Sequence, residues 1–286
     1  MKNLSNIGVI KDIMNRYGFS FSKGLGQNFL VNPSVCPKIA ELGNANERFG
    51  IIEIGTGFGV LTCELAKRAK KVVAIEIDSR LIPVLNETLS EYDNVKIINE
   101  DVLKVDLKKL IKNEFEGLEV AVCANLPYYL TSPIIMTLLE QKLPIKSVTV
   151  MVQKEAGERL CAKLGTREAG AITVAINYFA SAKMLFDVKR GSFMPSPNVD
   201  SCVIRLDIKE KTPDGVVDEE FFFKTVKAAF SQRRKTLANS VSSYFNLSKD
   251  IVFNAIEKTG LNESVRPEQM LMEDFIAFAN SLKYLI

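Results

Sequence analysis

The stretch from Ile51 to Thr62 constrains this chain most, because it places three glycines at alternate positions between two apolar patterns. The apolar run that ends at Ile54 is typical of a buried strand, and the residues from Val60 onward are apolar at helical spacing. Glycine permits positive φ and a close approach of a ligand, and a helix N-terminus offers free N–H groups. The stretch therefore predicts a strand, a tight turn and a helix that together bind a cofactor.

The residues around the glycines narrow the choice of cofactor. The dinucleotide fingerprint requires a glycine at Val60, and no Lys-Ser/Thr pair of a P-loop follows the turn. An acid before the first glycine, Glu53, resembles the S-adenosylmethionine turn of class I methyltransferases. Glu76 closes the next apolar run, where an acid can bind both ribose hydroxyls. A purely structural tight turn is the alternative.

Composition excludes several kinds of chemistry. The chain of 286 residues contains no histidine, which excludes Ser-His-Asp and Cys-His catalysis and histidine metal sites, and we expect no metal. Methyl transfer from a sulfonium fits, because the reagent is already activated and the protein mainly orients it. A net charge of +3 permits a polyanionic partner without arguing for one.

Cysteine usage and hydropathy bear on location. The five cysteines are scattered without a Cys-x-x-Cys pair, which indicates reduced thiols and a reducing compartment. No signal-peptide pattern and no membrane-spanning apolar run are evident, so we expect a cytoplasmic protein that binds no membrane. No long apolar stripe demands a partner subunit, and we expect a monomer.

Apolar runs alternate with helical patterns after the glycine turn, which predicts a parallel sheet with crossover helices. Ligands bind such sheets at the carboxyl ends of the strands. The residues expected at those ends are Glu53 with Gly55, Glu76, Asp101 and Asn125.

The flanking regions carry further predictions. A helix is expected within Leu4–Tyr17 and a loop over Phe19–Leu30, and Pro33 is expected to start a helix capped by Asn32. Later segments are expected to form strands at Ala171–Phe179, Lys183–Val188 and Cys202–Ile208, a linker at Lys209–Val216, and helices at Glu219–Tyr244, Lys249–Lys258 and Met272–Leu282.

The sequence Asn125-Leu126-Pro127-Tyr128 has the composition of a site that methylates the exocyclic N6 of adenine. That nitrogen is a poor nucleophile because its lone pair is delocalised into the ring. The Asn125 side-chain oxygen and the Leu126 carbonyl can accept its two hydrogens, and Pro127 fixes the bend. Tyr128 offers a flat face for an unstacked base. An ordinary strand-ending turn is the alternative.

Two other side chains have alternative interpretations. Phe193 lies in a proline-rich loop and is predicted either to cover the other face of the base or to anchor the loop. Asp101 is predicted either to accept from the amino group of the cofactor adenine or to cap a helix.

These motifs together resemble the rRNA adenine N6-dimethyltransferase family over nearly the whole chain. The matching stretches are Gly24–Leu30, Glu53–Gly59, Glu76–Asp78, Asn125–Tyr128, Gln153–Glu155 with Glu158-Arg159, Phe193–Ser201 and Phe230–Leu237. One departure is Thr56, where the family usually has proline.

The resemblance implies a Rossmann-like class I methyltransferase sheet with a small all-helical C-terminal domain. Residues 1–210 would be the catalytic domain with an N-terminal cofactor lid, and residues 211–286 would bind RNA. It implies that Tyr128 and Phe193 clamp the target adenine. The residues expected to contact S-adenosylmethionine are Asn28, Leu30, Gly55, Gly57, Glu76, Asp101 and Asn125.

Basic residues of the C-terminal region are the RNA-binding candidates. If one helix runs from Lys224 to Lys235, then Lys224, Lys227, Arg234 and Lys235 share a face, whereas Arg233 falls on the apolar side. Arg233 is then paired, extended toward solvent, or a sign that the helix breaks there. A solvated basic face without RNA is the alternative.

The expected function is S-adenosylmethionine-dependent dimethylation of N6 of two adjacent adenines near the 3′ end of 16S rRNA, within a small-subunit assembly intermediate, with a role in ribosome biogenesis. One alternative is dimethylation of 23S rRNA of the macrolide-resistance type. The other is a binding role in ribosome assembly without catalysis.

Overall fold

The computed structural model describes residues 4–20 and 27–286, which form two compact units. One comprises the described residues up to Gly157 together with Lys183–Ile208, and the other comprises Glu158–Ala182 with Lys209–Ile286. The sequence placed a single division at residue 210, whereas the second unit also includes residues 158–182. These residues group with the C-terminal helices, because one of their segments is a helix that packs there.

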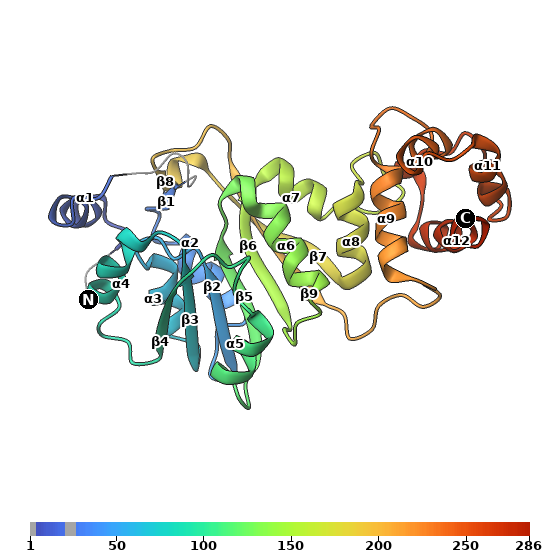
Figure 1. The fold of residues 1–286 in the computed structure, drawn as a ribbon. Coiled ribbons are helices and arrows are strands. Elements are labelled where there is room, and N and C mark those ends of the chain that lie inside the picture. Colours follow the sequence, from blue (N-terminus) through green and yellow to red (C-terminus); the bar gives the residue numbers. More distant parts are fainter. Residues whose placement is uncertain (1–3, 21–26) are drawn as a thin grey trace. The chain divides into compact units, whose positions relative to one another are not determined.

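The first unit is built on a seven-stranded sheet in the order β4-β3-β2-β5-β6-β9-β7 (Figure 1). Its strands are β2 Phe49–Ile54, β3 Lys71–Glu76, β4 Val95–Asn99, β5 Glu119–Asn125, β6 Ser147–Gln153, β7 Ala180–Val188 and β9 Ser201–Ile208. Strands β2 to β6 pair in parallel, as predicted, and β9 is antiparallel to β6. The register aligns Ile54 with Ile75 and Ala124, so the carboxyl ends of β2, β3 and β5 meet at one edge.

Helices cover both faces of this sheet. The α-helices described in this unit are α1 Ile7–Arg16, α2 Val35–Leu42, α3 Val60–Ala66, α4 Ile82–Thr88, α5 Leu107–Glu114, α6 Thr131–Glu140 and the first half of α7 Lys154–Leu160, and α1 packs with α4. Fully buried Ile39 of α2 and Leu65 of α3 pack with Ile51 of the sheet in one apolar core. On the opposite face a Cβ at Gly50 would lie 2.1 Å from the Phe115 ring, which follows α5. The tight packing of this layer leaves the strand ends as the open edge.

The N-terminal segments differ in part from the prediction. The first helix lies inside the predicted range, with Asn6 as its N-cap. Helix α2 begins at Val35 rather than Pro33, because Asn32 Oδ1 accepts from Ser34 N at 3.0 Å and closes a turn before the helix. In the predicted Phe19–Leu30 loop, residues 21–26 lie outside the described residues. Its last two residues form strand β1 (Phe29–Leu30), which is antiparallel to β8 (Phe193–Met194).

The second unit is helical. Its α-helices beyond α7 are α8 Ala171–Phe179, α9 Glu219–Ala229, α10 Leu237–Phe245, α11 Lys249–Glu257 and α12 Met272–Leu285. The prediction of a strand at Ala171–Phe179 was wrong. Its β-branched residues resemble a strand, but Gly170 N donates to the Thr173 hydroxyl at 3.0 Å and starts a helix. The Tyr178 ring then lies 5.3 Å from that of Phe222 on α9, which explains why this segment belongs to the helical unit.

The prediction of one helix from Glu219 to Tyr244 was also wrong. Helix α9 ends at Ala229, where the Ser231 hydroxyl donates to the Ala228 carbonyl at 2.7 Å. Thr236 then caps α10 by accepting from Asn239 N. Arg233 therefore falls on the apolar side of the predicted continuous helix because the helix is interrupted there. In the parts of the chain described, no helix is long and apolar enough to cross a membrane.

Candidate functional site

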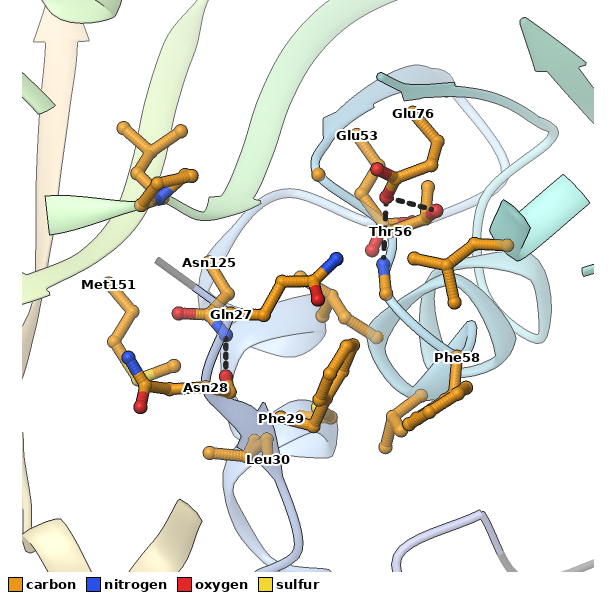
Figure 2. A pocket seen from close by; sticks show the side chains of 18 of the residues that line it. Gln27, Asn28, Phe29, Leu30, Glu53, Thr56, Phe58, Glu76, Asn125 and Met151 are labelled. Atoms are coloured by element: carbon orange, nitrogen blue, oxygen red, sulfur yellow. Dashed lines mark hydrogen bonds between the residues drawn. The ribbon is translucent and has the colours of Figure 1, made fainter. Parts of the chain in front are cut away.

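A cavity opens where the predicted site residues meet, at the carboxyl ends of β2, β3 and β5 (Figure 2). Strand β1 and the turn after β5 complete its wall. Six predicted residues line it directly: Asn28, Leu30, Gly55, Gly57, Glu76 and Asn125, and the predicted catalytic residues Leu126 and Tyr128 line it as well. Eight residues predicted to bind the cofactor or to take part in catalysis therefore lie in one cavity wall.

The glycine turn has the backbone that the sequence predicts. Gly55, Gly57 and Gly59 all have positive φ, at 76°, 58° and 86°. A Cβ at Gly57 would lie 2.9 Å from the Phe29 ring, so only glycine fits beneath β1. The turn leads directly into α3, whose N-terminal N–H groups face the same edge of the sheet.

Glu76 is held in place by hydrogen bonds from three backbone or side-chain groups. Its Oε2 accepts from the Thr56 hydroxyl and from Gly57 N, both at 3.1 Å, and its Oε1 accepts from Asp78 N at 2.9 Å. Burial raises the pKa of this carboxyl, and the three donors oppose the rise. Thr56, the departure from the family pattern, thus supplies a donor that proline lacks.

Glu53, the acid that precedes the first glycine of the turn, is a further functional candidate because of its buried side chain. It lines the cavity at 1% exposure, and its Oε2 has no hydrogen-bond partner among the described residues. Burial raises its pKa to about 8, and the nearby Glu76 carboxyl adds to the rise. The neighbouring Thr62 hydroxyl lowers the pKa in part, although it forms no hydrogen bond in the structure. An acid inside an otherwise apolar strand was the available signal.

The turn after β5 presents its polar atoms to the cavity. Asn125 Nδ2 donates to the Asn28 carbonyl at 3.4 Å (Figure 2), and no described residue donates to Asn125 Oδ1. Leu126 N donates to the Met151 carbonyl at 3.3 Å, which fixes the peptide, and no described donor contacts the Leu126 carbonyl. Tyr128 and Ser201 share a hydroxyl hydrogen bond of 2.9 Å. Two acceptors and an aromatic ring therefore belong to one short turn whose residues line the cavity.

Two predicted residues do not line the cavity. Asp101 Oδ1 accepts from Leu103 N at 3.0 Å, so this carboxylate caps the turn after β4 and not a helix. Phe193 is 5% exposed and packs in the sheet core, as expected of a loop anchor. Its register partner is Leu30, which does line the cavity.

Three further kinds of residue have a possible functional role: cysteines, metal ligands and exposed basic residues. All five cysteines are free, and burial raises the thiol pKa of Cys63 and Cys161 to about 11, so neither is a thiolate nucleophile. No cluster of three or more metal-ligating side chains occurs among the described residues. The predicted RNA-binding residues Lys224 and Lys227 are exposed on α9, and Arg233, Arg234 and Lys235 are exposed between α9 and α10.

Comparison with known proteins decides the family. The model of the family described as "Ribosomal RNA adenine dimethylase" matches residues 18–283. The chain belongs to the ribosomal RNA adenine dimethylase family. Members of this family are S-adenosylmethionine-dependent methyltransferases, and the chain is an rRNA adenine dimethyltransferase with a class I methyltransferase fold.

Individual members resemble the chain over almost its full length. The "Ribosomal RNA small subunit methyltransferase A" of Bacillus cytotoxicus is 47% identical over 99% of this chain and 98% of its own. The structure resembles that of a dimethyladenosine transferase from Plasmodium falciparum, with a TM-score of 0.74, 26% identity, and coverage of 90% of this chain and 98% of the other. The structure also resembles that of the 23S rRNA methyltransferase ErmE, with a TM-score of 0.64, 25% identity, and coverage of 90% of this chain and 100% of the other.

Proposed function

We propose that this family member dimethylates N6 of two adjacent adenines in the 3′-terminal hairpin loop of 16S rRNA, within a small-subunit assembly intermediate. The observation that carries the proposal is the turn after β5, where Asn125 Oδ1 and the Leu126 carbonyl are available beside Tyr128 at the cavity. The name of the Bacillus cytotoxicus relative supports the small subunit as substrate. We expect the enzyme to act as a monomer in the cytoplasm.

The cavity fits the cofactor of the family. S-adenosylmethionine would supply a methyl group carried on a sulfonium, and it is a cation with a ribose. Glu76 would accept the ribose hydroxyls, and Gly55 and Gly57 allow the backbone to approach. The unpartnered Glu53 carboxyl suits the positive charge of the ligand, because a buried carboxylate is stabilised by an adjacent cation. Asn28 and Leu30 would cover the ligand from β1.

Asp101 is also proposed to contact the cofactor. Its Oδ1 caps the turn, but no described residue donates to Oδ2. This oxygen follows β4 at the edge of the sheet that carries the cavity, and it would accept the amino group of the cofactor adenine.

The chain's own residues would prepare the adenine for reaction. With its two hydrogens bound by Asn125 Oδ1 and the Leu126 carbonyl, N6 would have its lone pair available for the methyl group. The nitrogen would become cationic on accepting the methyl group and would then lose a proton to water, so no histidine or other general base is needed in this arrangement.

Replacement of Tyr128 and replacement of Phe193 are expected to differ in their effects on activity and stability. Tyr128→Leu is expected to lower methyl transfer about 5- to 150-fold, because a base stacked on an aromatic ring gains roughly 1–3 kcal/mol, and to lower the melting temperature less than Phe193→Leu does, because Tyr128 is only half-buried. Phe193→Leu is expected to lower both methyl transfer and melting temperature, because Phe193 is a core residue beside the cavity wall. Thermal melting and single-turnover methylation of the two variants check this. Unchanged methylation in both would contradict the proposed clamp.

The exposed residues Arg233, Arg234 and Lys235 are proposed to bind rRNA phosphates. Replacing all three with glutamine is expected to weaken RNA binding and to reduce the slope of log K against log salt by about two, at 0.7 to 0.9 per lost phosphate contact. Filter binding over a salt series measures this. The double variant Lys11→Gln/Lys70→Gln, at exposed sites in the other unit, is the control. Equal slopes for the triple variant and the wild type would overturn the assignment.

One experiment tests the substrate. Labelled S-adenosylmethionine is offered with small-subunit particles that lack the modified adenines, and separately with naked large-subunit rRNA, and the products are mapped by mass. We expect N6,N6-dimethyladenine near the 3′ end of 16S rRNA. Label in large-subunit rRNA would instead favour the 23S activity, to which the likeness with ErmE points. Cofactor binding without label in either RNA would reject the proposed substrate.

A further inference from the structure

Tyr129 is an exposed aromatic residue beside the cavity that the mechanism above does not use. Its side chain is 56% exposed, whereas that of the preceding Tyr128 is half-buried and lines the cavity. No hydrogen bond, ring contact or cation contact of Tyr129 occurs among the described residues. A large apolar ring is thus left open to solvent, one residue from the predicted base-stacking position.

The backbone explains why the two tyrosines face different ways. Tyr128–Leu130 form one turn of 3₁₀ helix, in which Leu130 N donates to the Pro127 carbonyl at 3.0 Å. With three residues per turn, successive side chains point about 120° apart. When the Tyr128 ring forms the cavity wall, the Tyr129 ring therefore points in another direction, and its exposure shows that it extends into solvent.

The turn that carries both rings is held at several points. Leu126 N is bound to the Met151 carbonyl of β6, and the Tyr128 hydroxyl is bound to Ser201 of β9 at 2.9 Å. The Thr131 hydroxyl also donates to the Pro127 carbonyl, at 3.5 Å. The Tyr129 ring is accordingly presented from a fixed backbone, so that little conformational freedom is lost when a planar group stacks on it.

We propose that Tyr129 stacks on the base next to the adenine being methylated and holds this neighbouring nucleotide at the cavity rim. This inference rests on the proposed function, in which two adjacent adenines are modified. A base extruded into the cavity leaves its neighbour unstacked on one side, and an exposed aromatic ring replaces the lost stacking partner. Tyr129 is thereby a residue that determines substrate specificity rather than one that contacts the reacting atoms.

The test compares Tyr129→Ala and Tyr129→Phe on small-subunit particles that lack the modified adenines. We expect Tyr129→Ala to raise the KM for the particles about 5- to 100-fold, the range that corresponds to loss of one stacked base. We also expect a larger fraction of RNA in which only one of the two adenines is modified. Tyr129→Phe keeps the ring and is expected to match the wild type in both measurements.

Two controls separate this role from others. Met184→Ala, at an exposed apolar position on β7, is expected to change neither measurement. The affinity of Tyr129→Ala for S-adenosylhomocysteine and its melting temperature are expected to equal those of the wild type, because the residue lies outside the cofactor wall. A wild-type KM and product distribution in Tyr129→Ala would overturn the inference. Failure of the proposed function itself would be visible earlier, as absence of label in wild-type reactions with 16S rRNA.

Discussion

Replacing Asn125 with alanine is expected to lower the rate of methyl transfer about 10²- to 10³-fold, the effect typical of removing one preorganised hydrogen-bonding group from a site where charge develops. In the structure Asn125 Nδ2 is engaged by the Asn28 carbonyl, which leaves Oδ1 for the substrate amino group. Without that acceptor, N6 keeps its lone pair in the ring. Single-turnover methylation with saturating cofactor measures the chemical step, apart from any change in binding.

The matched control for this variant is Asn125→Asp. It keeps an oxygen acceptor for the substrate but loses the Nδ2 donor to the Asn28 carbonyl, so it is expected to retain more activity than the alanine variant and less than the wild type. Because Asn125 also lines the cofactor cavity, the affinity for S-adenosylhomocysteine is measured for both variants. Full activity in Asn125→Ala would refute the role assigned to this residue, whatever its effect on the cofactor.

The arrangement of the cavity wall was predictable because it follows from topology. In a parallel sheet the carboxyl ends of the strands meet, so polar residues at the ends of successive apolar runs must converge. The structure confirms this for Glu76 and Asn125. The glycine turn was equally readable, since three alternate glycines before a helical pattern leave few backbone alternatives.

Features that depend on long-range packing were not predictable in the same way. Ala171–Phe179 has the composition of a strand, but it forms a helix that Thr173 caps and that packs through Tyr178 against α9, a contact between segments far apart in the sequence. The burial of Phe193 likewise depends on strand β1, far away in the sequence. The exception is the break between α9 and α10, which Arg233 signalled by falling on the apolar side of a continuous helix.

Glu53 provides the second large effect, because a buried carboxyl without a partner makes stability depend on pH. Its pKa is about 8 in the folded protein, against an ordinary value of 4.5. Below pH 4.5 the carboxyl is protonated in both the folded and the unfolded state. Between pH 4.5 and 8 the unfolded chain releases a proton that the folded protein retains, so the free energy of unfolding falls as pH rises. The change amounts to about 1.4 kcal/mol for each unit of pKa difference.

The variant Glu53→Gln removes this titration while conserving size and polarity. We expect its melting temperature to exceed that of the wild type by an increasing margin from pH 5 to pH 8, by about 10 °C at the upper limit, since each kcal/mol corresponds to roughly 2–4 °C in a protein of this size. Other titrating groups are present in both proteins, so the difference between the two curves isolates Glu53. A difference in melting temperature that does not change with pH would show that the pKa of the Glu53 carboxyl is not raised.

Cofactor binding is expected to remove the loss of stability that the raised pKa of Glu53 causes. A cation bound beside Glu53 favours the ionised carboxyl and lowers its pKa, so ligand binding releases a proton near pH 7. We expect saturating S-adenosylmethionine to stabilise the wild type more strongly at pH 8 than at pH 5, and to stabilise Glu53→Gln by an amount that depends less on pH. Calorimetric titration in buffers of different ionisation enthalpy measures the released proton directly. Equal proton release by both proteins would show that the cation binds elsewhere in the cavity and that Glu53 has only a structural role.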